Sequence, residues 1–215
     1  ELYYHKQLFV QAAENFDGAL VRKKALVGEV HTEIADIYRK KSLLAFVMND
    51  LTQAFQLAEQ NRKILEQLVA GDTTRWADYY LALGSFYDRM GKHEEARSNY
   101  DHSLQINLKT RGEWHPQTGR AYLNLSNILR IKENPLHARA YAEKALHIFE
   151  QVYGKRHMMV GSVNNSLAIL DADLGDQAKA IVYYQNALDI ISEKMGAQSM
   201  QTAYLLNNLG IAYGN

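Results

Sequence analysis

The sequence predicts an all-α fold, a solenoid of antiparallel helix pairs. A pattern at residues 80–96 returns after 42 residues at 122–138, returns again at 164–180, and restarts at Leu206. Self-similarity at a fixed period indicates a repeat array. The repeated positions follow the i, i+3, i+4, i+7 spacing of one apolar helix face, and no segment shows the strict alternation expected of a strand.

Each repeat places small residues opposite large ones, which lets two antiparallel helices pack closely. One column of the first helix is always Leu: Leu83, Leu125, Leu167 and Leu209. The next column is small: Gly84, Ser126, Ala168 and Gly210. The second helix carries an Ala followed four residues later by a bulky or small partner, as in Ala96 and Tyr100. A Gly closes each unit, which suits a helix C-terminus with positive φ.

These columns resemble the tetratricopeptide repeat, whose usual unit is about 34 residues. A unit of 42 residues, with a longer second helix and a loop such as 112–116, is similar to the kinesin-light-chain type of that repeat. The resemblance covers most of the chain and is most specific from Arg75 to Asn215. It implies a right-handed superhelical (TPR-like) array in which the first helices line a concave groove.

Residues 1–31 are expected to be a partial repeat, because Ala12 and Gly28 fall two periods before Ala96 and Gly112. In this register the chain opens inside a first helix and stops inside another. Both ends would then expose apolar packing surface, which tends to be an interaction site or a liability. We therefore expect an excised or partly ordered piece of a longer protein that can self-associate through its exposed array ends.

Residues 32–74 form the most divergent repeat. Lys41 stands in the Leu column, and Asn61 and Arg62 stand where the next unit has Ser and Leu. Such a departure is either a specialised surface or drift, and the sequence leaves both open. Two helices are still expected, near 32–48 and 51–69.

The rest of the chain divides into regular units, namely 75–115, 116–157 and 158–199, followed by 200–215 as the first helix of a truncated repeat. The helices are expected near 74–90, 94–111, 116–132, 136–153, 158–174, 177–195 and 199–214. Pro116 suits a first helical position, where its missing N–H costs nothing. Pro135 lies in a turn between helices, where it can end one.

Composition argues against several classes of function. The 24 Lys and Arg balance 24 Asp and Glu among 215 residues, which disfavours a dominant role with nucleic acid or an anionic membrane. No Cys is present, so there is no disulfide framework, as in a reducing cytosol. No apolar run approaches membrane-spanning length. We expect a cytoplasmic protein without direct nucleic-acid or membrane binding.

No constellation of catalytic residues stands out. The eight His do not pair at metal-ligand spacing, and neither a phosphate-binding Gly motif nor a nucleophile elbow is present. His115 and His157 share one loop column, where capping or stacking is favoured over metal binding. We predict that the chain is not an enzyme and has no cofactor, metal or catalytic residues.

The groove is the candidate site. Its columns contain five Asn, although Asn is only a modest helix former. A side-chain amide can both donate and accept, so it can pair with the backbone of an extended peptide; hydrogen bonding between helices or simple exposure is the alternative. The predicted peptide-binding residues are Arg89, Arg120, Asn124, Asn127, Arg130, Asn165, Asn207 and Asn208.

The resemblance refines this prediction. Kinesin-light-chain arrays hold short cargo peptides with groove Asn residues, whereas the cationic clamp of chaperone-tail-binding repeats is absent from the matching columns. We therefore predict a non-catalytic scaffold that binds a peptide or protein segment, with the three Arg favouring acidic or mixed-charge segments. The alternative is a sensor array of a larger signalling or transcription-regulating protein, which binds an effector and controls a linked domain.

Overall fold

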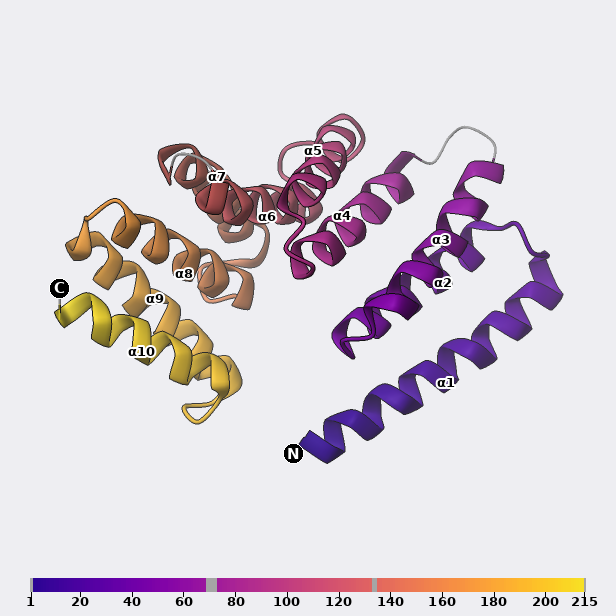
Figure 1. Ribbon diagram of the computed structural model, residues 1–215, viewed down its shortest axis with the longest axis horizontal. Coiled ribbons are helices and arrows are strands. Elements are labelled where there is room, and N and C mark those ends of the chain that lie inside the picture. The colour runs from indigo at the N-terminus through magenta and orange to yellow at the C-terminus, as the bar shows by residue number, and fades with distance from the viewer. Residues whose placement is uncertain (1, 69–72, 133–134, 215) are drawn as a thin grey trace. The chain divides into compact units, whose positions relative to one another are not determined.

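The computed structural model describes residues 2–68, 73–132 and 135–214, and this part of the chain contains ten α-helices and no strand (Figure 1). The predicted all-α class is confirmed. The helices are α1 (Leu2–Val27), α2 (Thr32–Val47), α3 (Leu51–Gln67), α4 (Thr73–Arg89), α5 (His93–Thr110), α6 (Pro116–Lys132), α7 (Pro135–Tyr153), α8 (Met158–Asp173), α9 (Gln177–Met195) and α10 (Met200–Gly214). Residue 69, the expected end of one helix, lies outside the described residues.

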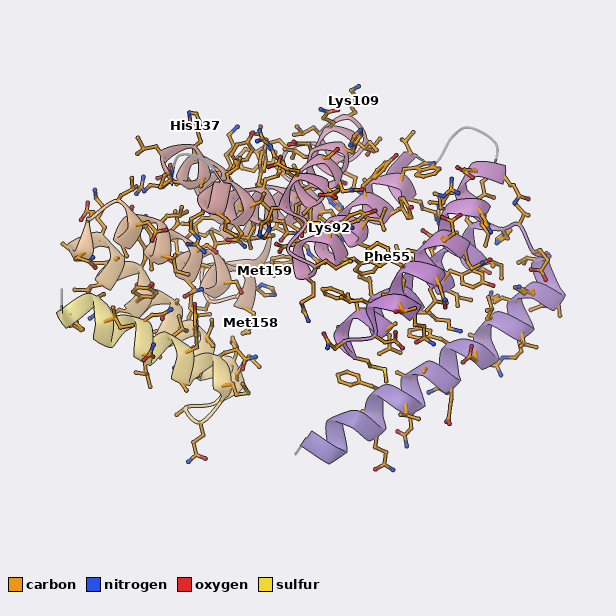
Figure 2. The ribbon with its side chains drawn as sticks, in the orientation of Figure 1. Phe55, Lys92, Lys109, His137, Met158 and Met159 are labelled. Atoms are coloured by element: carbon orange, nitrogen blue, oxygen red, sulfur yellow. The ribbon has the colours of Figure 1, made fainter. Side chains whose placement is uncertain are left out.

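The chain divides into two compact units, residues 1–106 and 107–215, with the boundary inside α5. In the first unit, α2 packs on α3, and α4 packs on α5. The small column works as predicted there, because a Cβ atom added to Gly84 of α4 would lie 2.5 Å from the Tyr100 ring of α5. Aromatic rings also link neighbouring pairs. Phe55 of α3 is labelled in Figure 2. Its ring centroid lies 5.4 Å from that of Phe86 in α4.

The N-terminal helix α1 is continuous where the regular units have a turn between two helices. It runs without a break from Leu2 to Val27. The turn between α4 and α5 depends on Gly91, which has φ 71°. Two periods earlier the sequence has Gln7, a good helix former, so nothing interrupts the helix.

Two polar substitutions of the divergent α2–α3 pair have partners on neighbouring helices. Asn61 of α3 is buried, and its Nδ2 donates to the carbonyl oxygen of Ala35 in α2 at 2.7 Å. Lys41 forms an ion pair with Asp17 of α1. Asn61 and Lys41 are therefore structural contacts between helices, whereas Arg62 pairs with Glu59 of its own helix.

The second unit contains the pairs α6–α7 and α8–α9, and α10 packs on α9 (Figure 1). Leu125 and Leu167 of the Leu column are fully buried. Ser126 of the small column donates its hydroxyl to the carbonyl oxygen of Ala138 in α7 at 2.7 Å. In the next pair, Ala168 packs in a core with Ala180 and its neighbours. Small side chains thus bring the paired helices together, as predicted.

Loop residues define where the helices begin and end. Gly112, which closes a unit, has φ 85°, as expected for a helix C-terminus. His115 Nδ1 accepts from the Gln117 amide at 3.1 Å, and His157 Nδ1 accepts from the Met159 amide at 3.2 Å. The capping interpretation of this His column is confirmed. His31, two periods before His115, caps α2 in the same way and was missed.

Candidate functional site

A hollow of about 490 Å³ lies among the helices of the second unit. It is lined by the first helices of successive pairs, with one residue from α9. We call it the main hollow, and its lining residues are Leu123, Asn127, Ser162, Asn165, Ser166, Ile191, Met200, Gln201, Tyr204 and Leu205. This volume lies within the range of about 300–1,000 Å³ that is usual for ligand sites.

The main hollow is apolar at its base and uncharged throughout its described lining. Leu123, Ile191 and Leu205 are buried, whereas Tyr204 is 54% exposed at the rim. No lining residue is Asp, Glu, Lys or Arg. Because no charge has to be desolvated, an apolar side chain can enter at little cost.

Two amides give this hollow its polar character. Asn127 Oδ1 accepts a hydrogen bond from the Ser166 hydroxyl at 3.1 Å, which joins α6 to α8. Asn165 Oδ1 is buried and has no hydrogen-bond partner among the described residues. An unpaired buried acceptor costs about 1–3 kcal/mol, so a donor supplied by a ligand would be favoured here.

A second hollow of about 240 Å³ lies where α8 ends, α9 begins and α10 passes. We call it the end hollow, and it is lined by Ala172, Asp173, Gln177, Tyr184, Asn208, Ile211 and Ala212. Burial raises the pKa of the Tyr184 hydroxyl above its ordinary value. This hydroxyl is therefore neutral at pH 7.

The structure brings together some of the predicted peptide-binding residues. Asn127 and Asn165 line the main hollow, and Asn208 lines the end hollow. Arg120, Asn124 and Asn207 line neither of these hollows. Within the second unit, three of the predicted amides therefore line a hollow, and the peptide-binding role of all the predicted residues stays a prediction.

Two of the three predicted arginines have partners within the protein. Arg130 Nη1 lies 3.2 Å from Asp173 Oδ2. Arg89, in the first unit, lies 4.6 Å above the Phe46 ring and donates to Asn49 Oδ1 at 3.4 Å. An acidic ligand would have to compete with these contacts, and the predicted preference for acidic segments stays a prediction.

Sequence reasoning missed several lining residues. Ile191 and Gln177 belong to α9, a second helix, and the prediction considered first helices only. Met200 is the first residue of α10 and stands one period after Met158, outside the columns assigned to the groove. The repeat register could have identified these residues. In each unit, the end of the second helix lies beside the start of the first helix of the following unit.

The described residues contain neither a cluster of metal ligands nor a membrane-spanning helix. Within residues 2–68, 73–132 and 135–214, no three His, Asp or Glu side chains gather closely enough to hold a metal ion. Over the same residues, every helix is too short or too polar to cross a membrane.

A model of the family described as tetratricopeptide repeat matches residues 77–151 and 121–190, together more than half of the chain. The chain therefore belongs to the tetratricopeptide repeat family.

The array is of the kinesin-light-chain type. It is 27% identical over 154 residues to the Protein KINESIN LIGHT CHAIN-RELATED 3 of Arabidopsis thaliana, covering 69% of this chain and 22% of that protein. It is 22% identical over 177 residues to a Clustered mitochondria protein homolog of Emericella nidulans, covering 82% of this chain and 14% of that protein. The chain thus spans only a small part of the length of these curated relatives.

A solved structure shows the same fold. The crystal structure of BtubC (BKLC) from P. vanneervenii superposes with a TM-score of 0.77 at 21% identity, covering 97% of this chain and 83% of that chain. At this identity the similarity bears on the fold alone.

Proposed function

We propose that the chain is a non-catalytic protein-interaction module that binds an extended segment of another protein in the main hollow. Membership of the tetratricopeptide repeat family supports the general role of an interaction scaffold. The observation that carries the specific proposal is the uncharged hollow with the unpaired buried Asn165 Oδ1.

An extended segment supplies both a hydrogen-bond donor and an apolar side chain, and the main hollow can accept both. Its backbone presents an N–H donor at nearly every residue, and one such donor would satisfy Asn165. Its side chains point alternately to opposite sides, so one of them can enter between Leu123, Ile191 and Leu205. The three buried side chains favour an apolar group at this point.

The test starts from peptides selected on this chain from a phage-displayed random library. A selected peptide is then titrated by fluorescence anisotropy against the double variant Asn127→Ala, Asn165→Ala. We expect affinity to fall at least about tenfold, or about 1.4 kcal/mol, with helicity unchanged and stability lowered only by the lost Asn127–Ser166 hydrogen bond, about 0.5–1.5 kcal/mol. Asn186→Ala is the matched control, because Asn186 is exposed on α9 and lines neither hollow.

Two outcomes would contradict the proposal: a library that yields no binder, or selected peptides that bind the double variant as tightly as the wild type. Asn124→Ala distinguishes the site defined by the main hollow from the larger site predicted from the sequence. Since Asn124 lines neither hollow, we expect it to change affinity less than about twofold.

Three predictions from the sequence stay predictions. These are the cytoplasmic location, the alternative role as an effector sensor, and self-association through the array ends. For the last, Leu206 and Tyr213 of α10 are 51% and 61% exposed. Sedimentation at high concentration checks it, and a clean monomer would count against it.

A further inference from the structure

The end hollow differs from the main hollow in charge. Asp173 is the only carboxylate among its lining residues, and none of them is cationic. Asp173 is also the last residue of α8, and the C-terminal end of a helix carries the negative end of its dipole. The local field therefore favours a positive group.

Arg130 does not fully occupy this carboxylate. The ion pair joins Arg130 Nη1 to Asp173 Oδ2, and the two side chains are 35% and 41% exposed. Pairs this exposed contribute only about 0–1 kcal/mol. An ionised carboxylate accepts hydrogen bonds at both oxygens, so Asp173 can take a second donor without losing Arg130.

A second acceptor lies in the same hollow. Gln177 Oε1 is buried and has no hydrogen-bond partner among the described residues. Gln177 lines the hollow together with Asp173. A side chain that carries several N–H donors would satisfy both, and lysine and arginine are the residues that combine such donors with positive charge.

The spacing of the two hollows sets the spacing in the ligand. Along α10, Tyr204 lines the main hollow, and Asn208 and Ile211 line the end hollow. At about 1.5 Å per helical residue, these positions lie about 6–10 Å apart along the helix. An extended chain advances about 3.3 Å per residue, so it covers this distance in two or three residues.

We propose that the bound segment carries a lysine or arginine two or three residues from its apolar anchor, and that this basic side chain enters the end hollow beside Asp173 and Gln177. This inference rests on the proposed function, because it assigns the second contact of the same bound segment. It reverses the preference for acidic segments that the sequence predicts.

The test compares two variants that break the same ion pair in opposite ways. Asp173→Asn removes the carboxylate, and Arg130→Gln keeps it. In peptides selected from the random library on wild-type protein, we expect enrichment of Lys or Arg at this spacing. Replacing that residue by Gln should weaken binding about threefold to fivefold to the wild type and to Arg130→Gln, but leave binding to Asp173→Asn unchanged.

The outcomes separate the two proposals. Suppose that Tyr204→Ala weakens binding of the selected peptides. If the wild-type protein then binds the Lys→Gln peptide as tightly as the original peptide, or if an acidic residue is enriched at the position of the lysine, the end-hollow assignment is wrong and the proposed function stands. The same conclusion follows if Asp173→Asn and Arg130→Gln weaken binding of the basic peptide equally, because the ion pair between the two residues would then have a structural role. If Tyr204→Ala leaves every selected peptide unaffected, the proposed function itself is wrong.

Discussion

The two units of the chain use the polar positions of one repeat in different ways. In the first unit, Asn61 donates to Ala35 and Arg89 stacks on Phe46, so these groups hold helices together. In the second unit, Ser166 of α8 donates to Asn127 of α6 in the same way, but Asn165 and Gln177 present buried acceptors without partners among the described residues. The difference teaches that a polar group in a repeat column stabilises the fold when a neighbouring helix supplies its partner, and is available to a ligand when none does.

The largest effect is expected from the Leu column. Leu125 of the second unit is 1% exposed, whereas Leu83 of the first unit is only half-buried. Leu125→Ala should lower the free energy of unfolding by about 2–5 kcal/mol, and Leu83→Ala by less than about 2 kcal/mol. Urea denaturation of both variants measures this difference, and equal losses would show that burial does not distinguish the two units.

The small column gives the next effect, with opposite signs in the two units. A Cβ at Gly84 would lie 2.5 Å from the Tyr100 ring, whereas a Cβ at Gly210 would meet nothing within 4 Å. Gly84→Ala should destabilise by about 1–3 kcal/mol through overpacking. Gly210→Ala should stabilise by up to about 1 kcal/mol, since Ala is the better helix former. Thermal melting of both variants is the measurement, and stabilisation by Gly84→Ala would refute the close contact.

A smaller effect is expected where a polar residue joins two helices. Asn61→Ala restores the small residue of the regular repeats but removes the hydrogen bond to Ala35, so it should cost about 0.5–1.5 kcal/mol. Asn99→Ala is the control, because the Asn99 amide bonds only within its own helix, to Glu95, and should change stability by less than about 0.5 kcal/mol. Equal urea midpoints for Asn61→Ala and Asn99→Ala would show that the hydrogen bond of Asn61 does not stabilise the protein. The departure from the repeat at this position would then be drift.

The smallest effect is expected in alkaline solution. Burial raises the pKa of the Tyr79 hydroxyl to about 12 from its ordinary 10.0. The unfolded chain therefore loses this proton before the folded chain does, so the contribution to stability is complete below pH 10 and falls between pH 10 and 12. Tyr79→Phe should flatten this decline, as followed by urea midpoints at pH 8, 10 and 11. Identical pH profiles for variant and wild type would contradict it.

Much of the fold could be predicted because the signal is repeated. The Leu and small columns recur in several units, so the helix ends in the described residues agree with the predicted ones within a few residues. Departures from the repeat at single positions were harder to predict. Gln7 stands where the next full turn has Gly91, and α1 continues through it. Asp171 stands in the column of Leu129, and its Oδ1 accepts from Arg139 Nε at 2.8 Å, whereas its Oδ2 is buried without a partner among the described residues.

The candidate site could be predicted only in part. The register places Asn127, Asn165 and Asn208 on first helices, but it cannot show which side chains meet. Whether an arginine is free or paired depends on a residue one period away, as for Arg130 and Asp173. Pairing of this kind is set by rotamers and distances between helices, which the spacing of columns does not contain.

The face of α10 that no helix of the described residues covers makes this array a template for modular engineering. Ala203, Leu206, Gly210 and Tyr213 are all exposed, although their columns are largely buried in the regular units. That face therefore specifies its complement: a helix with an Ala followed four residues later by a bulky side chain, as in Ala180 and Tyr184. Since repeats contact only their neighbours, the array could be lengthened in steps of 42 residues, and each added unit should contribute a similar increment of stability.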